Sequence, residues 1–334
     1  MVACSESRGA VDAPEGVPSS TAVDVGAPTG VPSSTAVGVG APTASVGLAF
    51  SLANAGDYLA IPTYDGSGQV VHPDIVYFSQ GWRGHRYWMA MTPYPSDTDS
   101  YENPSILVSE DGLSWAAPDG VTNPLVARPG CDHNSDPDLV YNPTTDELLL
   151  YYTEQQRAEY CADSNVNRVL LLRSSDGVNW TKPEVVLEWD LSTEPLYLSP
   201  SVVLHGGTFE MWLASSDGVV RATSDDGVRW STAEKVNMEI VPWHLDVAWV
   251  ELEAAYWALL VESPAAGSRL RLATSGDGKD WTVQPEPVLS PGAAWDAERI
   301  YRSTFVVDGD SLRVWYSARS NDYQWHVGYA EGRR

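Results

Sequence analysis

A seven-residue motif, Ser-x-Asp-Gly-x-x-Trp, occurs four times in the chain and restricts the possible folds more than any other feature. The copies occupy residues 109–115, 174–180, 224–230 and 275–281. Their spacing of about 50 residues is typical of β-propellers, in which each repeat is one four-stranded blade. An apolar, strand-like stretch precedes each copy, and Asp-Gly favours a tight hairpin turn because glycine tolerates a positive φ. We therefore interpret the motif as a structural turn and not as a catalytic element.

Two further strand-like segments precede each motif. The segments that align as first strands are 72–78, 136–142, 199–205, 244–250 and 301–307. The fifth unit ends after its third strand, and we expect part of residues 46–62 to supply its fourth strand. Closing the ring in this way also removes an exposed sheet edge. The sequence thus predicts an all-β fold, a five-bladed β-propeller over residues 46–334 with almost no helix.

Residues 1–45 have a different composition. They consist almost entirely of Gly, Ala, Val, Pro, Ser and Thr, repeat the stretch GVPSSTAV, and contain no aromatic residue. Such a segment buries too little apolar surface to offset its ordering entropy, so we predict a disordered N-terminal tether. The start MVAC-S resembles the end of a bacterial lipoprotein signal without its apolar stretch. Either Cys4 is a lipid anchor, which implies an extracellular or cell-surface location, or it has no function.

The net charge of −25 limits the possible partners. Nucleic acids and anionic membrane surfaces require cationic surface, so we expect no nucleic acid partner and no membrane contact beyond the possible lipid anchor. A neutral carbohydrate fits this charge. Cys131 and Cys161 flank one candidate hairpin; they either form a disulfide, which would imply an oxidising compartment, or remain two buried thiols.

The first strand of every propeller blade lines the central axis, and polar residues stand at the N-terminal ends of these strands. They are His72, Asp74, Asp136, Asp138, Ser199, Ser201, His244, Asp246, Tyr301, Arg302 and Ser303. Second strands return to the same face and bring further polar residues near its rim: Tyr94, Glu154, Ser215, Glu262 and Arg319. Carboxyl groups brought together raise one another's pKa, which favours a general acid and a base in one pocket.

These units resemble the five-bladed propeller glycosidases of glycoside hydrolase families 43 and 32 and their relatives, over about residues 46–334. The resemblance implies hydrolysis of a polysaccharide or oligosaccharide by paired carboxylates, with no cofactor and no metal except a possible structural calcium. In these families the catalysts are usually two aspartates on successive blades and a glutamate acid. Asp136, in SDPDLVYN, matches the Asp-Pro pattern. His72 stands where the first blade's acid is expected, and the third blade lacks an inner glutamate, although Glu194 lies just upstream.

We assign candidate roles on this basis. The candidate catalytic residues are Asp136, Asp74, Asp246 and Glu194. The candidate substrate-binding residues are His72, Asp138, Glu154, His244, Glu262, Tyr301, Arg302 and Trp243. Structural roles remain open for each: Asp136 and Asp138 suit a turn or a structural cation, and His244 suits packing. For Glu102 we favour a solvated loop acid, and for Trp82, Trp88 and Trp295 we favour packing over sugar stacking.

Two other functions remain open. A non-catalytic carbohydrate-binding propeller is consistent with the missing aspartate in the first blade and the missing glutamate in the third. A mannoside-phosphorylase-like enzyme would need a phosphate site, for which Arg302, Arg319 and His244 are candidates. Two carboxyl groups facing each other across an open pocket would favour a glycosidase over the binding propeller.

Overall fold

The computed structural model describes residues 53–54, 56–263 and 267–333. The chain divides into two units, Met1–Val46 and Gly47–Arg334. The predicted tether and Cys4 lie outside the described residues, and both remain predictions. No helix in the described part of the chain has the length and apolar character needed to cross a bilayer.

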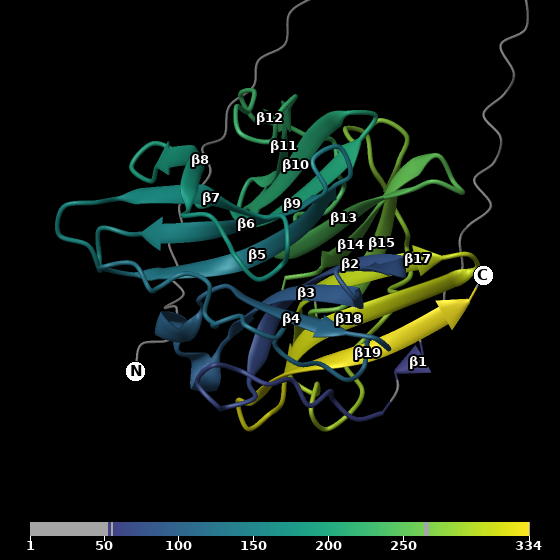
Figure 1. Ribbon diagram of the computed structural model, residues 1–334. Coiled ribbons are helices and arrows are strands. Elements are labelled where there is room, and N and C mark those ends of the chain that lie inside the picture. The colour runs from purple at the N-terminus through teal and green to yellow at the C-terminus, as the bar shows by residue number, and fades with distance from the viewer. Residues whose placement is uncertain (1–52, 55, 264–266, 334) are drawn as a thin grey trace, which may run out of the picture. The chain divides into compact units, whose positions relative to one another are not determined.

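The second unit consists of five antiparallel sheets in sequence order (Figure 1). Blade one contains β2 (Val70–Trp82), β3 (His85–Pro93) and β4 (Ser105–Ser109). Blade two contains β5 (His133–Asn142), β6 (Glu147–Gln156), β7 (Val166–Ser174) and β8 (Glu184–Asp190). Blade three contains β9 (Leu198–His205), β10 (Thr208–Ser215), β11 (Gly218–Ser224) and β12 (Glu234–Lys235). Blade four contains β13 (His244–Val250), β14 (Ala255–Val261), β15 (Leu270–Ser275) and β16 (Thr282–Val283).

Blade five combines both ends of the unit. Its strands are β17 (Arg299–Asp308), β18 (Ser311–Arg319), β19 (Trp325–Arg333) and β1 (Ala53–Asn54). Strand β1 pairs antiparallel with β19, with Ala53 opposite Glu331 (Figure 1). The innermost strands contact one another in a closed series from β2 through β5, β9, β13 and β17 back to β2. The predicted five-bladed propeller and the predicted closure of blade five by residues from 46–62 are therefore confirmed.

The hydrophobic core lies between the blades. Five clusters of buried apolar side chains each combine residues from two adjacent blades. Trp82 and Trp88 pack between blades one and two, and Trp295 packs between blades four and five, as expected for core residues. The only helices in the described residues are two 3-10 turns in the β3–β4 loop, η1 (Pro95–Asp97) and η2 (Asp99–Tyr101).

The repeated motif forms the predicted turn. In the copy of blade two, the Ser174 hydroxyl accepts a hydrogen bond from Gly177 N–H at 2.8 Å, and Asp176 Oδ1 accepts from Val178 N–H at 2.8 Å. The motif's tryptophan does not begin the fourth strand of blade two, because β8 begins only at Glu184. In blade one, the described residues show a single bridge between Val108 and Ala116 instead of a fourth strand.

The turn also joins neighbouring blades, which the sequence did not indicate. At three of the four turns, an aromatic side chain on the second strand of the preceding blade donates a hydrogen bond to the turn glycine's carbonyl. Tyr151 OH lies 2.9 Å from Gly227 O, and Trp212 Nε1 lies 2.9 Å from Gly278 O. The motif is thus an inter-blade contact as well as a hairpin turn.

Candidate active site on the propeller axis

Each blade contributes two polar side chains to the propeller axis, from positions two residues apart on its first strand. Side chains at such positions lie on the same face of a strand, so the residues form two layers. The first, which we call the axial layer, consists of His72, Asp136, Ser199, His244 and Arg302. The second, which we call the hydrogen-bond ring, consists of Asp74, Asp138, Ser201, Asp246 and Thr304. The predicted convergence of polar residues on the axis is therefore present.

The hydrogen-bond ring connects each blade to the next. Each of its side chains accepts a hydrogen bond from a backbone N–H of the following blade: from Leu139 to Asp74 at 2.6 Å, from Val202 to Asp138 at 3.0 Å, from Val247 to Ser201 at 2.8 Å, from Phe305 to Asp246 at 3.3 Å, and from Ile75 to Thr304 at 3.3 Å. Each backbone donor is the residue after its own blade's ring position. The ring thus repeats one contact around the whole axis.

This geometry adds a structural role for three aspartates that are also candidates for catalysis or substrate binding. Burial raises the pKa of Asp74, Asp138 and Asp246, the last to about 8. Beyond the ring the axis opens into a cavity of about 500 Å³ on the opposite face. The carboxyls at its floor are already engaged by backbone N–H groups, so the axial layer is the better candidate for chemistry.

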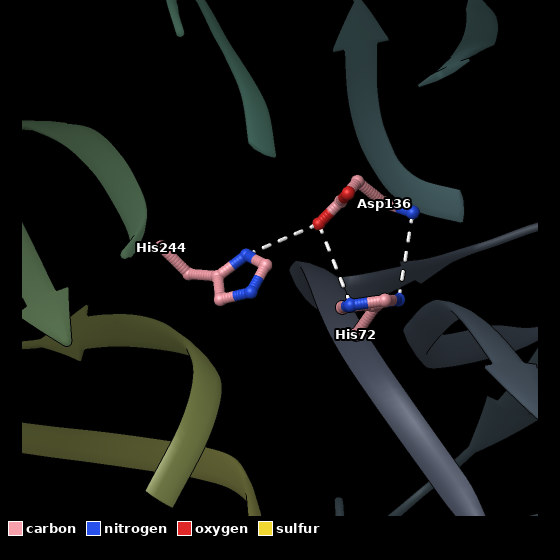
Figure 2. Close-up of side chains that lie close together, drawn as sticks. All are labelled: His72, Asp136 and His244. Atoms are coloured by element: carbon pink, nitrogen blue, oxygen red, sulfur yellow. Dashed lines mark hydrogen bonds and ion pairs between the residues drawn. The ribbon is translucent and has the colours of Figure 1, made fainter. Parts of the chain in front are cut away.

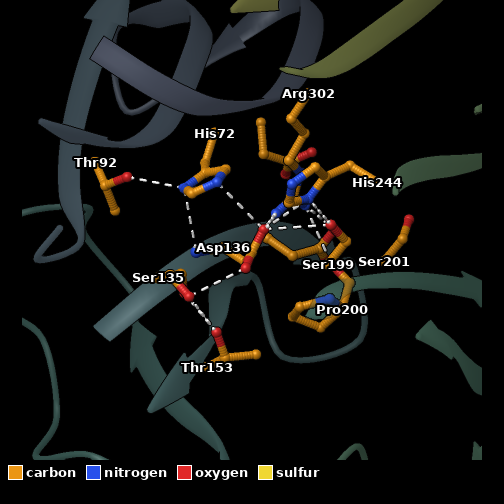
Figure 3. Close-up of polar contacts among 12 residues, drawn as sticks. His72, Thr92, Ser135, Asp136, Thr153, Ser199, Pro200, Ser201, His244 and Arg302 are labelled. Atoms are coloured by element: carbon orange, nitrogen blue, oxygen red, sulfur yellow. Dashed lines mark hydrogen bonds and ion pairs between the residues drawn. The ribbon is translucent and has the colours of Figure 1, made fainter. Parts of the chain in front are cut away.

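Asp136 is the centre of the axial layer (Figure 2). Its Oδ1 atom lies 3.5 Å from His72 Nε2, 3.3 Å from His244 Nδ1 and 3.2 Å from Ser199 Oγ. Arg302 reaches across the axis from blade five and donates from Nη1 to the same oxygen at 3.1 Å (Figure 3). All five side chains are essentially inaccessible to solvent. One carboxylate oxygen thus faces two imidazoles and a guanidinium from three other blades.

The backbone turns these side chains towards the axis by an unusual local conformation. His72, Asp136 and Ser199 have φ values of 53°, 50° and 50°, in the left-handed region. The strand pairing shifts register at each of these places, as at a β-bulge. Positive φ at residues other than glycine costs on the order of 1–3 kcal/mol and occurs preferentially at functional sites. Each of the three residues precedes a proline, which is a signal that the sequence already contained.

The pair of histidines and Asp136 have the properties of a metal-binding group. Their ligand atoms lie within 4.8 Å of one another. Among the described residues, Nε2 of His72 and Nε2 of His244 have no hydrogen-bond partner. Burial lowers the pKa of both imidazoles, that of His72 to about 3, so both are in the neutral form that binds metals.

The electrostatics of Asp136 complete this group. Burial alone would raise the pKa of its carboxyl, but His72, His244 and Arg302 hold the pKa well below its usual range. Asp136 is therefore ionised at neutral pH. Two neutral imidazoles and one carboxylate form a donor set that suits a divalent transition-metal ion with open coordination positions. The residues present fit such an ion.

Glu102 is a functional candidate that the sequence analysis placed in solvent. The structure buries it, with 3% of its surface exposed, and its Oε2 lies 3.3 Å from His72 Nδ1. Burial and the nearby charges of Asp99 and Asp136 raise the pKa of Glu102 well above its ordinary value. Within the described chain, Oε2 has no hydrogen-bond partner. No pattern in the sequence marked this residue, because the two 3-10 turns fold its loop back over the axis.

Aromatic side chains border the axial layer on the side of the β3–β4 loop. The Tyr301 ring lies 5.1 Å from the His72 ring and 4.4 Å from the His244 ring, between centroids. Trp243 lies 5.9 Å from Tyr301. Tyr301 and Trp243 are both partly exposed, unlike the histidines beneath them. These two partly exposed rings therefore border the buried axial layer on this side.

The other predicted site residues do not join this cluster. Glu154 pairs with Arg168 at 3.0 Å, and Glu262 pairs with Arg271 at 2.6 Å. Glu194 is exposed in the loop between β8 and β9. These three carboxylates lie on rims and loops, whereas His72, Asp136, His244, Tyr301 and Arg302 are brought together.

Comparison with known proteins agrees with this architecture. No family model matches the chain. The chain is 31% identical over 373 residues to an A type blood N-acetyl-alpha-D-galactosamine deacetylase from Flavonifractor plautii, an alignment that covers 84% of this chain and 47% of the relative. The chain thus spans about half the length of that curated relative.

Solved structures give the same result. A crystal structure of an N-acetylgalactosamine deacetylase from F. plautii, in complex with blood group B trisaccharide, has a TM-score of 0.74 at 29% identity and covers 84% of this chain and 95% of that one. A thermostable family-43 glycoside hydrolase has a TM-score of 0.52 at 11% identity, covering 78% and 88%. A GH62 hydrolase in complex with xylotriose has a TM-score of 0.59 at 13% identity, covering 84% and 96%.

The chain has the fold of the five-bladed propeller glycoside hydrolases. The resemblance predicted from the repeated motif is therefore confirmed for the fold. The five-bladed propeller supplies the axis, and a function must be argued from the residues of the axial layer and not from the fold.

Proposed function

We propose that this protein is a carbohydrate-active hydrolase that removes the acetyl group from an N-acetylated amino sugar. The observation that carries the proposal is the buried cluster of His72, Asp136 and His244, with the buried carboxyl of Glu102 beside it, whose Oε2 makes no hydrogen bond among the described residues. The similarity to a deacetylase at 31% identity supports the same reaction. Paired carboxylates alone, as in most glycosidases, would not require two neutral imidazoles on the axis.

The reaction is hydrolysis of an amide. A divalent cation bound by His72, Asp136 and His244 would polarise the acetyl carbonyl and increase the acidity of a bound water. Glu102 accepts a proton from the attacking water and returns it to the sugar nitrogen as the carbon–nitrogen bond breaks. The products are acetate and the free amino sugar. A raised pKa suits a carboxyl that must both accept and donate a proton near neutral pH.

Two further residues prepare the site. The Arg302 guanidinium donates to Asp136 and, from Nη2, to Pro200 O at 3.2 Å, so it fixes the position and charge of the carboxylate. Desolvation of the hydroxyl end of Tyr301, with a smaller contribution from the neighbouring carboxyl of Glu102, raises the pKa of Tyr301 well above its usual value. Its hydroxyl therefore keeps its proton and is available to donate a hydrogen bond to the substrate.

Hydrolysis of a glycosidic bond is a second candidate, because Glu102 and Asp136 are two buried carboxyls on either side of His72 and related folds are glycoside hydrolases. This reaction would need no metal, in line with the expectation from sequence. Phosphorolysis is less well supported, because Arg302 and Arg319 already pair with carboxylates.

The disulfide supports an extracytoplasmic location as part of the proposal. Cys131 and Cys161 are bonded, with their Cα atoms 5.5 Å apart. Structural disulfides form and persist mainly in oxidising compartments.

Acetate release from glycans that contain N-acetylgalactosamine or N-acetylglucosamine tests the proposed reaction. We expect release by the wild type, its loss after treatment with EDTA, and its return with added divalent ions. His244→Ala should lower kcat by on the order of 10²–10³, as expected when a group that stabilises transition-state charge is removed. It should also lower the metal content measured by mass spectrometry. His85→Ala, at a partly exposed imidazole outside this cluster, is the matched control.

Other outcomes would redirect the assignment. Reducing sugar released without acetate, unaffected by EDTA and lost in Asp136→Asn, would establish the glycosidase instead. Retention of glycans without any product would indicate a binding propeller.

A further inference from the structure

Three exposed tyrosines lie on the face of the propeller that is nearer to the axial layer, where the first strands begin. Tyr101, Tyr160 and Tyr323 are 40%, 55% and 57% exposed. Each stands in the loop between the second and third strands of its blade, in blades one, two and five. These loops share one face of a propeller, because the second strand returns to the end where the first begins.

The Tyr160 ring is held from below. The Arg157 guanidinium lies over it, 4.7 Å from the ring centroid. Asp132 binds Arg157 through two oxygens, each 2.8 Å from a guanidinium nitrogen. Cys161, the residue after Tyr160, forms a disulfide with Cys131, the residue before Asp132. This bond fixes the two backbone segments relative to each other. The ring is thus exposed on one side and supported by a paired cation and a covalent bond on the other.

The Tyr323 ring has the same kind of support. The Arg319 guanidinium lies 4.7 Å from its centroid, with the Arg319 side chain 10% exposed. Glu298 binds this guanidinium through both carboxylate oxygens, and Asp97 accepts from Nη1 at 2.7 Å. Cation–π contact with a paired guanidinium limits the motion of an exposed ring.

The two arginines are both tied to the β3–β4 loop. Asp97 in η1 binds Arg319, and Asp99 in η2 lies 3.9 Å from Arg157. The same loop carries the exposed Tyr101 and then buries Glu102 beside His72. The supported rings of blades two and five therefore stand on the two sides of the loop that covers the candidate active site.

We propose that Tyr160, Tyr101 and Tyr323 form sugar subsites that bind a glycan chain on both sides of the sugar residue at the axis. This inference rests on the proposed function and names its substrate class: an oligosaccharide or polysaccharide, not a free amino sugar. Pyranose rings present flat CH faces, which pack on aromatic rings, and hydroxyl edges, which bind charged groups. Here the exposed rings alternate with Asp97, Asp99, Arg157 and Arg319, which matches both features of a sugar chain.

Acetate release from N-acetylhexosamine oligomers of one to six residues tests the subsites. In the wild type, we expect kcat/KM to rise by on the order of 10-fold or more from the monosaccharide to the hexamer, because each stacked sugar adds binding free energy. Tyr160→Ala and Tyr323→Ala should each lower kcat/KM for the hexamer by about 5- to 10-fold and leave kcat/KM for the monosaccharide unchanged. Tyr160→Phe, which keeps the ring, should retain most of the rise in kcat/KM with chain length. Tyr58→Ala is the control, an exposed tyrosine in the segment between β1 and β2.

Affinity electrophoresis in gels that contain the N-acetylated polymer separates this inference from the proposed reaction. Retardation that falls in Tyr160→Ala and Tyr323→Ala supports the subsites even if no acetate is released. Acetate release that does not depend on chain length, or an equal loss on monosaccharide and hexamer, overturns the subsites while the deacetylase stands. Retardation that is equal in all variants, or absent in all, also overturns them.

Discussion

At the scale of single residues, the proposed site depends on three positions that adopt an unfavourable backbone conformation. His72, Asp136 and Ser199 all have a positive φ and all precede a proline. Their strain persists because the blades on either side hold the strands in place. It turns the His72 imidazole and the Asp136 carboxylate onto the axis, where His244 from blade four reaches the same oxygen (Figure 2). The site is thus assembled from residues that are far apart in sequence.

Glu102→Gln tests the proton transfer that we assign to this residue. The amide cannot accept a proton, so kcat should fall by on the order of 10²–10⁴ with little change in glycan binding. Because burial raises the pKa of Glu102, wild-type activity should increase with pH through a limb above the usual carboxyl range. The variant's pH profile should lack that limb. Glu110→Gln, at an exposed carboxylate, is the control; an unchanged limb in Glu102→Gln would assign the proton transfer to another group.

At the scale of elements, the Asp-Gly turn has two structural functions. It ends the third strand, and its glycine allows a bulky aromatic ring of the preceding blade to approach. A Cβ atom at Gly177 would lie 2.1 Å from the Trp88 ring. This contact explains why glycine follows the aspartate in every copy, and it cannot be deduced from the turn alone.

Gly177→Ala measures this inter-blade contact. Gly177 and Gly66 have φ values of +76° and +78°, but a Cβ atom at Gly66 would meet no atom within 4 Å. Both variants incur the cost of a positive φ, about 1–2 kcal/mol. Gly177→Ala adds overpacking against Trp88, about 1–3 kcal/mol more. Urea denaturation should therefore show a clearly larger loss of unfolding free energy for Gly177→Ala; equal losses would mean that the Trp88 ring moves aside without cost.

At the scale of the whole propeller, closure combines a strand pairing with a ring of side-chain contacts. Strand β1 completes blade five, and the hydrogen-bond ring links every blade to the next on the axis. The ring also separates the axial layer from the cavity on the opposite face. Its aspartates therefore support the site by holding the first strands together.

Two truncations test the closure. Removal of residues 1–46 should leave the thermal midpoint unchanged, as expected for a tether. Removal of residues 1–56 also removes β1 and the Gly56 carbonyl that accepts from Trp295 Nε1 at 2.9 Å. A loss of about 2 kcal/mol in the free energy of unfolding would lower the thermal midpoint by roughly 4–8 °C. The edge of β19 that this truncation exposes should also promote aggregation. Equal midpoints for the two variants, measured by calorimetry, would show that β1 does not stabilise the blade.

The sequence by itself determined the fold, because a repeat of about 50 residues with Asp-Gly turns encodes local strand and turn preferences that recur in every blade. It also placed His72, Asp136, His244 and Arg302 on the axis, since first strands must line it. Only the tertiary structure decided their roles. Asp74 and Asp136 both lie on first strands. Asp74 accepts a hydrogen bond from a backbone N–H group, whereas Asp136 faces two imidazoles. The difference arises because neighbouring blades supply the partners of each side chain. Glu102 became a candidate only when its loop folded back over the axis, a long-range contact that no local pattern encodes.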